Sequence, residues 1–410
     1  MNFKNYLEEA KNTHMTHIED MVIDGGVEGT RAALNALRDL RDMLGGSDNS
    51  SKQVTVKWDG APAVFAGIDP ADGEFFVAKK GIFNKNPKVY KSHAEIKADI
   101  PNPDLASKMK IAYTELKKVG IKKGVFQGDI MFTGDDLKKE TIDGVKYVTF
   151  HPNTIVYAVP VEAAREVLNA KIGVVWHTKY TGSSFESMSA SFGVKLSEFK
   201  KVSSVWQKSA DLPDLSGVAT LTKKETDEIT KHISNAGKLF HKIKAGALKD
   251  VSTDKDINLF INTFRNTKVR QQIEIKDTRK HVEELITWIH ARYDKEIDKL
   301  KSDKGKAKKN AAKIEALAWF SADNKKNLQN MFDMQNELVD AKHKLLARLD
   351  KVGSINTFVK TNSGFKVTGA EGYVAIDHLT NGAVKIVNRM EFSHNNFSKN
   401  IIKGWENESR

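Results

Sequence analysis

The stretch Val54–Gly60, which reads VTVKWDG, decides the fold of this chain. Its two valines alternate with Thr55 and Lys57, which predicts a strand whose valines face inward and whose polar residues share the other face. Asp59 and Gly60 are a tight-turn pair, so the strand is predicted to end just after Lys57. A lysine in that place is either a solvent-exposed residue of a hairpin or a nucleophile, because an amine desolvated beside other cations loses its proton more readily.

Further β-rich runs follow this stretch and predict a sheet. They lie at residues 63–67, 75–79, 124–130, 146–150, 154–159 and 171–176. Each run is short and rich in β-branched or aromatic residues. A helix is predicted at about residues 103–119. Residues from roughly 50 to 200 are therefore predicted to form an α+β domain with a mostly antiparallel sheet.

A helical block separates this region from the last β-rich runs. Apolar residues keep helical spacing at 282–300 and again at 331–349, and the strand pattern vanishes between about 221 and 351. Short β-rich runs return at 365–367, 371–376 and 383–387. Because the helices interrupt a β-rich region, the last strands are predicted to pair with the sheet that contains Lys57.

These patterns divide the chain into three parts. Residues 49–220 together with 352–410 are predicted to form the α+β core, and residues 221–351 a helical insertion. Residues 1–48 are predicted to form an N-terminal helical segment, because leucines recur there at spacings of three and four.

Composition limits the possible functions. The 410 residues carry 65 Lys and Arg against 53 Asp and Glu, a formal charge of +12 that favours polyanionic partners such as nucleic acid or nucleotides. The count of cysteines is zero, which excludes disulfides, thiolate zinc sites and cysteine nucleophiles and fits a reducing compartment. Apolar stretches stay shorter than about 18 residues and an apolar signal core is missing, so neither a membrane span nor Sec-type secretion is expected.

The segment Lys301–Ala316 is rich in lysine. It carries six lysines against Asp303 and Glu315 and lacks an apolar period. One interpretation is a solvated linker between two helices. The other is a nucleic-acid contact. The lysines assigned to that contact are Lys304, Lys306, Lys308 and Lys309.

The Lys57-x-Asp59-Gly60 pattern resembles the adenylation motif of the covalent nucleotidyltransferase superfamily, which includes ATP-dependent DNA ligases, RNA ligases and mRNA capping enzymes. In that superfamily further strand motifs follow in a fixed order, and this chain has similar ones. They are Phe76–Gly81 (FVAKKG), Val125–Met131 (VFQGDIM), Lys171–Trp176 (KIGVVW), Glu371–Val374 (EGYV) and Ala383–Val387 (AVKIV). The resemblance implies an antiparallel-sheet core like a ligase adenylation domain, interrupted by the helical insertion.

The resemblance also implies a chemistry. Lys57 would attack the α-phosphate of ATP, release pyrophosphate and keep AMP as a lysyl phosphoramidate. Asp129 and Glu371 would hold Mg²⁺, and lysines would neutralise phosphate charge. Phe126 or Trp176 would stack on adenine. The residues implied to bind the nucleotide are Asp59, Gly60, Lys79, Lys80, Phe126, Asp129, Trp176, Glu371, Lys385 and Arg389.

Plainer interpretations of these residues remain open. Asp129 would instead cap a turn, Glu371 would be a surface carboxylate, and Trp176 would be part of the core. Lys79 and Lys80 alternate along their strand, so one of them is expected to point into the site.

The chain departs from the superfamily pattern in two places. The basic residue that often follows Lys-x-Asp-Gly is replaced by Ala61-Pro62-Ala63. The last motif usually has a second lysine, where this chain has Val387. Arg389 lies on the same strand face by parity, about 13 Å beyond Lys385 at roughly 3.3 Å per residue, so it compensates only if the strand bends. Both departures bear on catalytic competence.

The leading interpretation is an ATP-dependent, RNA ligase-like adenylyltransferase with ATP and Mg²⁺ as cofactors. About twenty residues follow the last motif, too few for the oligonucleotide-binding barrel of standard DNA ligases and capping enzymes, so RNA is favoured over DNA as partner. The alternative is a basic nucleic-acid-binding protein, packaged in the virion, whose nucleotidyltransferase fold has lost its catalytic function.

The first ten residues, MNFKNYLEEA, resemble capsid-targeting peptides of T-even-type phages. The prohead protease of such phages cleaves after a hydrophobic-x-Glu pattern, here Leu7-Glu8-Glu9. The start of an amphipathic helix is the alternative. The whole chain resembles an uncharacterised protein family of these phages, which implies the host cytoplasm and packaging into the virion as locations.

Overall fold

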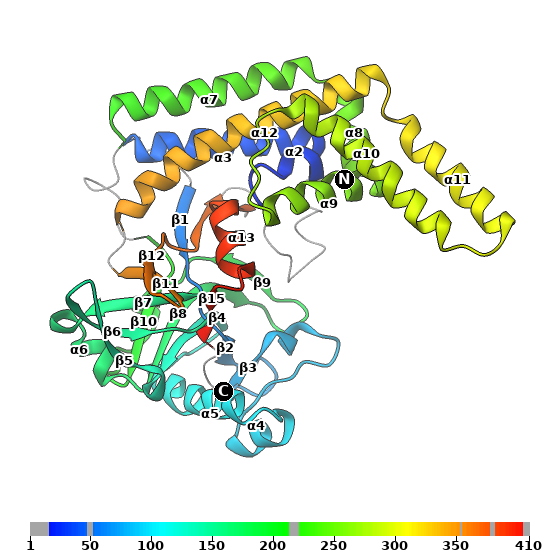
Figure 1. The fold of residues 1–410 in the computed structure, drawn as a ribbon. Helices are drawn as coiled ribbons and strands as arrows, with labels where there is room; N and C mark the ends of the chain where they lie inside the picture. The colour runs from blue at the N-terminus through cyan, green and yellow to red at the C-terminus, as the bar shows by residue number, and fades with distance from the viewer. Residues whose placement is uncertain (1–15, 47–51, 213–220, 353–354, 378–381, 405–410) are drawn as a thin grey trace.

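The protein combines a layer of helices with three β-sheets (Figure 1). The computed structural model describes residues 16–46, 52–212, 221–352, 355–377 and 382–404. The ten-residue peptide with the predicted protease site lies outside these residues. The predicted α+β class is confirmed, since all strand pairs in the described residues are antiparallel apart from β10 (Val205–Ser209) with β8 (Ile172–Thr181).

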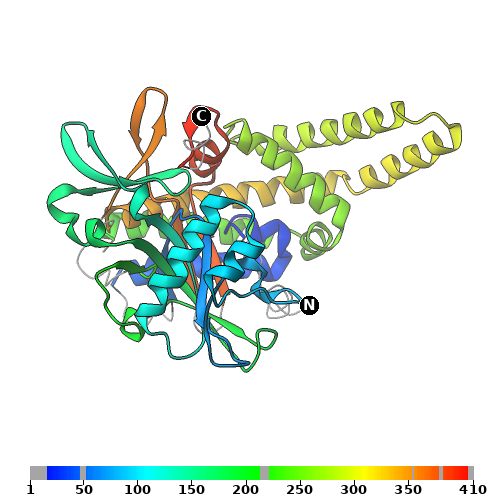
Figure 2. The ribbon, with the colours of Figure 1, turned by 90° about the horizontal axis from the view of Figure 1, so that it is seen from below.

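One six-stranded sheet has the order β10-β8-β4-β2-β3, and β9 pairs with β8. Its further strands are β2 (Ala63–Ile68), β3 (Phe75–Ala78), β4 (Val125–Thr133) and β9 (Ser189–Phe192). Helices α4 (His93–Asp99) and α5 (Pro103–Leu116) cover one face of this sheet, as Figure 2 shows. Apolar side chains of both helices and of the strands form a common core there.

The second six-stranded sheet has the order β12-β11-β7-β6-β5, with β15 paired to β11. Its strands are β5 (Lys138–Ile142), β6 (Val145–Phe150), β7 (Ile155–Pro160), β11 (Asn356–Thr361), β12 (Gly364–Val367) and β15 (Ile401–Ile402). Helix α6 (Arg165–Asn169) lies beside it. Phe150 and Tyr157 of this sheet pack with Phe132 and Trp206 of the first sheet, so a shared core joins the two.

The third sheet contains Lys57 and has the order β1-β13-β14. Its strands are β1 (Lys52–Lys57), β13 (Gly372–Asp377) and β14 (Gly382–Ile386). The strand register places Lys57 opposite Gly372 and Val374 opposite Lys385. The prediction that the last strands return to the strand of Lys57 is therefore confirmed.

The helical layer lies on one side of this third sheet. It consists of α2 (Met21–Asp24), α3 (Gly26–Leu44), α7 (Lys223–Lys242), α8 (Ala245–Thr253), α9 (Lys255–Arg270), α10 (Thr278–Asp298), α11 (Asp303–Ala318) and α12 (Ala322–Leu349). The leucines that predicted the N-terminal helix are buried in one core with α7–α12. The N-terminal helices are thus part of the helical layer.

The lysine-rich segment forms helix α11, which extends with α10 as a projecting hairpin (Figure 1). The segment between the two predicted helices is itself a helix, because lysine and alanine are strong helix formers even where nothing buries them. None of the described residues of α11 is buried. Lys309 and Lys313 pair with Glu296 and Asp294 of α10, each at 2.5 Å.

Among the described helices, none has the length and apolar content needed to cross a membrane.

The last helix, α13 (Arg389–Phe397), follows β14 directly. Its N-cap is Asn388, whose side chain accepts a hydrogen bond from the Glu391 backbone N–H at 3.3 Å. This cap ends the strand and turns the chain across the end of the third sheet. Helix α13 thereby reaches the residues around Lys57.

Candidate active site

Lys57 ends β1, and its amine forms an ion pair with the carboxylate of Glu371. Glu371 immediately precedes Gly372, the residue opposite Lys57 in the sheet. Gly372 has φ of +143°, and a Cβ there would lie 2.4 Å from Cγ2 of Val387. A glycine is therefore required at this bend, which aims the Glu371 side chain at Lys57.

Asp129 reaches the same site from β4. It pairs with Ala63, the first residue of β2, and Ala63 follows the turn at Gly60. A Cβ on Gly60 would lie 2.4 Å from Cβ of Asp129, so glycine lets the turn approach the carboxylate. Burial raises the pKa of Asp129 to about 7, helped by the negative charge of Glu371 and opposed by Lys57.

Glu371 shares this electrostatic setting. Burial raises its pKa to about 7, and the adjacent Lys57 amine opposes that rise. Two carboxyl groups whose pKa values are near 7 thus lie close to the amine of Lys57. Such a pair can take up a proton from the amine or share a cation, because ionising both without a counter-charge is unfavourable.

Lys385 and the ring of Phe392 also lie near Lys57. Burial lowers the pKa of Lys385, and the positive charge of Lys57 lowers it further. The ring of Phe392, on α13, lies with its centroid 5.6 Å from Nζ of Lys57 and 5.9 Å from Nζ of Lys385. We refer to Lys57, Asp129, Glu371 and Lys385 as the Lys57 cluster.

The family model that matches this chain spans nearly all of it. It is described as a family of unknown function (DUF6267) and matches residues 12–401. The chain belongs to this family. The match includes the helical layer as well as the sheets. No curated protein and no solved structure gives a significant match.

Asp59 has a structural role in this DUF6267 chain. Its carboxylate accepts hydrogen bonds from Asn153 Nδ2 at 2.8 Å and from the backbone N–H groups of Thr154 at 2.6 Å and Ile155 at 2.9 Å. It therefore fastens the turn after Lys57 to the start of β7. The predicted contact with nucleotide is not what its geometry favours, since three protein donors already occupy the carboxylate.

Both neighbouring lysines lie beyond the end of β3, which ends at Ala78, so strand alternation does not place them. Lys79 lies beside α4, with Nζ 3.9 Å from Asp99 Oδ2 and 6.0 Å from the centroid of Tyr90. Lys80 is exposed, and its positive charge opposes the rise in the pKa of Asp129.

The structure does not bring Phe126 and Trp176 to the site. They are 2% and 0% exposed and pack with Phe199 beneath α4 and α5. The predicted stacking on adenine is therefore wrong for both rings, since neither presents a face to solvent. The aromatic ring at the site is Phe392, which no sequence motif distinguished.

Arg389 does not continue the strand of Lys385. It is the first residue of α13, and its guanidinium binds Asp20 Oδ1 at 2.5 Å and Asn266 Oδ1 at 2.6 Å. The prediction that it lies on the strand face of Lys385 was wrong, because β14 ends at Ile386 and the chain turns into a helix. Val387 is buried and supplies no charge.

His177 joins the site beside Asp129. Its Nε2 lies 3.8 Å from Asp129 Oδ2, and its Nδ1 lies 2.7 Å from the Thr178 hydroxyl. Burial lowers the pKa of His177 to about 4, helped by the charge of Lys57, so the ring is neutral at pH 7. The one signal for it in the sequence is its position, since His177 directly follows the strand motif that ends at Trp176.

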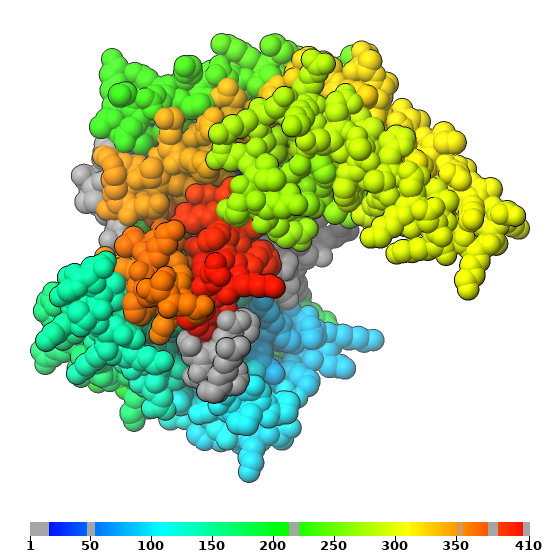
Figure 3. Space-filling model, in the orientation of Figure 1, coloured from blue at the N-terminus to red at the C-terminus, as the bar shows by residue number. Residues whose placement is uncertain are grey.

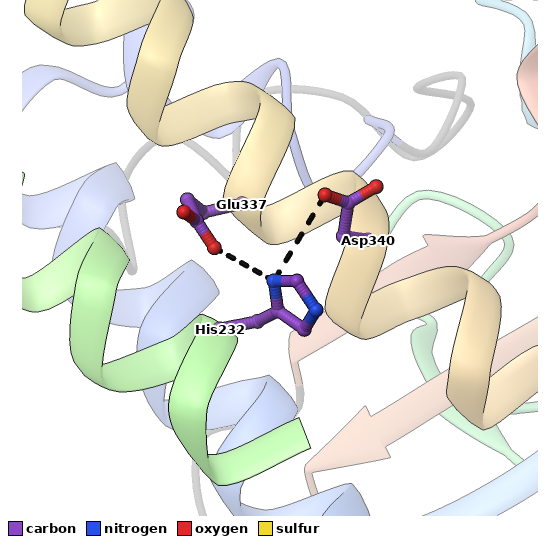
Figure 4. Close-up of side chains that lie close together, drawn as sticks. All are labelled: His232, Glu337 and Asp340. Atoms are coloured by element: carbon purple, nitrogen blue, oxygen red, sulfur yellow. Dashed lines mark hydrogen bonds and ion pairs between the residues drawn. The ribbon is translucent and has the colours of Figure 1, made fainter. Parts of the chain in front are cut away.

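Asp129 and Glu371 offer the oxygen ligands that Mg²⁺ prefers. The negative charge of Glu371 raises the pKa of Asp129, so added positive charge would favour the ionised form of that carboxylate. A separate group, His232 with Glu337 and Asp340, lies between α7 and α12 (Figure 4). His232 Nδ1 is 2.7 Å from Glu337, which is an ordinary charged hydrogen bond on the surface of the helical layer.

Proposed function

We propose that this protein is an ATP-dependent adenylyltransferase that forms lysyl-AMP at Lys57 and acts on nucleic-acid ends. The observation that carries the proposal is the Lys57–Glu371 contact, with Asp129 and Lys385 beside it. These residues come from four of the motifs that resemble the covalent nucleotidyltransferases, and two of the motifs follow the helical insertion. A nucleotidyltransferase fold for the core is part of the same proposal.

The first chemical step uses the amine of Lys57. The neutral amine attacks the α-phosphorus of ATP, an N–P bond forms, and the bond from the α-phosphorus to the bridging oxygen breaks with release of pyrophosphate. Glu371 is placed to accept the amine proton, because it contacts the amine and its pKa lies near 7. Asp129 and Glu371 would hold Mg²⁺, which supplies positive charge to the phosphates.

The second step transfers AMP to a nucleic-acid end. An oxygen of a terminal phosphate attacks the phosphorus of lysyl-AMP, a P–O–P bond forms, and the N–P bond breaks to return the Lys57 amine. Sealing of ends would follow from attack of a hydroxyl on the activated phosphate. The charge of +12 supports a nucleic-acid partner, and RNA is proposed ahead of DNA.

The proposal also keeps the phage setting that the sequence implies. The protein would act in the host cytoplasm or be packaged in the virion after a prohead protease cleaves behind Glu9. The cleavage behind Glu9 rests on the resemblance of the first ten residues to capsid-targeting peptides, and the location rests also on the resemblance of the whole chain to a phage protein family.

A specific observation favours the alternative of a packaged nucleic-acid-binding protein without catalysis. Val387 stands where the superfamily has its second lysine, and Arg389 is bound to Asp20 instead of the site. The cavity between α13 and Glu371 has a volume of ≈ 20 Å³, which suits a water and not a nucleotide. Catalysis therefore requires that ATP enter from the side of Asp129 and Lys80 or that α13 shift.

Labelling with ATP decides between the two. The protein is incubated with Mg²⁺ and ATP labelled at the α-phosphate, and then separated on a denaturing gel. We expect wild type and Lys79→Ala to retain acid-labile, base-stable label and Lys57→Ala to retain none, because Lys79 faces α4 and Lys57 is the nucleophile. Label on Lys57→Ala would refute the nucleophile, and unlabelled wild type would favour the alternative.

A further inference from the structure

A groove with a volume of ≈ 730 Å³ lies beside α13, on the face shown in Figure 3. The β11–β12 hairpin forms one wall, and α13 with the residues that lead into β15 forms the other. Figure 3 shows these segments next to each other in orange and red. The volume falls within the range of ligand-binding clefts, so the groove can hold a short segment of an extended polymer.

The groove leads toward the Lys57 cluster. Glu391 and Asn395 of α13 line the groove and also line the small cavity that Asp59 and Glu371 border. Glu371 in turn contacts Lys57. Two side chains of one helix therefore separate the groove from the space next to the proposed nucleophile.

Two lysines lie in and beside the groove. Lys366 lines it and is exposed, and Lys360 lies with Nζ 5.5 Å from the centroid of the lining ring of Phe365. Among the described residues that line the groove, Glu391 is the one carboxylate. It accepts hydrogen bonds from the Thr368 hydroxyl at 2.8 Å and the Gly369 N–H at 3.3 Å, so its Oε1 is engaged within the protein.

Neutral hydrogen-bonding side chains supply most of the remaining polar lining. They are Thr361, Asn362, Ser363, Asn395 and Asn400. Hydroxyl and amide groups of this kind bind phosphate and sugar oxygens without regard to sequence. The rings of Phe365 and His394 add surfaces on which bases can stack.

The geometry points to this groove as the track for the single-stranded nucleic-acid segment next to the reacting end. The assignment of a reacting end rests on the proposed function, whereas binding of the strand in the groove does not. A polypeptide is the less favoured occupant. The lysines and the amide groups can bind the phosphates of a nucleic-acid backbone, and an aromatic ring can stack on a base.

Charge reversal at the groove tests the assignment. Lys366→Glu is compared with Lys97→Glu, a matched change at an exposed lysine of α4, on the far side of the first sheet. Affinity for single-stranded RNA and DNA of about 12 nucleotides is measured by fluorescence anisotropy at several salt concentrations. We expect Lys366→Glu to weaken binding about tenfold with a smaller salt slope, and Lys97→Glu to bind within about twofold of wild type.

A photo-cross-linking amino acid in place of Ser363 gives the location directly. Nuclease-sensitive adducts with added RNA or DNA support the groove, and the more strongly captured strand identifies the sugar. Unchanged binding by Lys366→Glu, or a failure of position 363 to capture the bound strand, overturns the assignment. Adducts that resist nuclease and yield to protease identify a polypeptide and also overturn it.

Self-labelling with ATP separates this inference from the proposed function. Lys366→Glu should form lysyl-AMP at the wild-type rate, since the first step uses no nucleic acid. If wild type fails to form lysyl-AMP while Lys366→Glu still loses nucleic-acid binding, the proposed function fails and the groove stands.

Discussion

Asp129 is the residue at which the charge of the site most directly opposes folding. Its pKa is raised to about 7 in the folded protein, against about 4 for an unfolded aspartate, so the folded state binds more protons between these values. The contribution of Asp129 to stability is therefore highest below about pH 4 and falls as the pH rises through about 7. Asp129→Asn removes this loss and should raise the melting temperature at pH 8, with the gain fading toward pH 4. Glu162→Gln, at an exposed carboxylate, is the control, and a gain that does not depend on pH would contradict the assignment.

Gly60 tests how closely the turn after Lys57 must approach Asp129. A Cβ at this position would also lie 2.9 Å from Sδ of Met131, so Gly60→Ala must displace the strand that carries the carboxylate. We expect a loss of stability of roughly 1–3 kcal/mol, typical of overpacking, and a larger fractional loss of lysyl-AMP formation. Gly134→Ala is the matched control, because a Cβ there meets nothing within 4 Å. Denaturant unfolding and ATP labelling measure the two effects, and equal results for both variants would refute the argument.

Helix α11 is the element whose charge is most open to a partner. Lys304, Lys306 and Lys308 are exposed, whereas Lys309 and Lys313 pair with α10. Replacing the three exposed lysines with Gln should weaken RNA binding and lower the salt slope by at most about three, one for each phosphate contact. Lysyl-AMP formation should not change.

Replacement of Lys309 and Lys313 with Gln is the control for this helix. It alters pairs that hold α11 against α10, so it should affect RNA binding less than the exposed set. Circular dichroism checks that both variants keep their helix. If the three exposed lysines can be replaced without any change in affinity or salt slope, α11 is a structural arm and not a contact.

Many of the strands could be predicted from the sequence, because alternation and turn residues act locally, whereas β5, β9, β10 and β11 and the order of strands in the sheets were not predicted. The pairing of β13 with β1, the strand of Lys57, could also be predicted. The helical block interrupts a β-rich region, and strands on either side of such an insertion are expected to belong to one sheet. A place for Trp176 in the core was one of the two predicted alternatives and is confirmed. The burial of Phe126 was not predicted, because helices cover one face of its sheet and a register irregularity between Gln127 and Gly128 shifts the alternation. The place of Phe392 depends on where α13 packs, which is a tertiary contact without a local signal.

At the scale of the whole molecule, a buried ion pair joins the segment before α2 to α12, the longest of the described helices. Lys342 of α12 is 0% exposed and donates to both carboxylate oxygens of Glu19, at 2.9 and 2.8 Å. Gln335 of α12 donates to the Glu19 carbonyl at 2.7 Å, which fixes the same segment. Because the neighbouring Asp20 binds Arg389 of α13, this segment also connects the helical layer to the helix that covers Lys57.

Removing one partner of this pair should therefore unfold the molecule more easily. Lys342→Met leaves the Glu19 carboxylate buried without its counter-charge, which costs roughly 3–5 kcal/mol. The double variant Lys342→Met with Glu19→Gln should recover a large part of this loss, because the uncompensated charge is then gone. Lys344→Met, on the same helix, breaks a solvent-screened pair with Glu228 and should cost far less. Denaturant unfolding of the four proteins gives the comparison, and a Lys342→Met cost no larger than that of Lys344→Met would show that the buried pair does not hold the helical layer to the N-terminal segment.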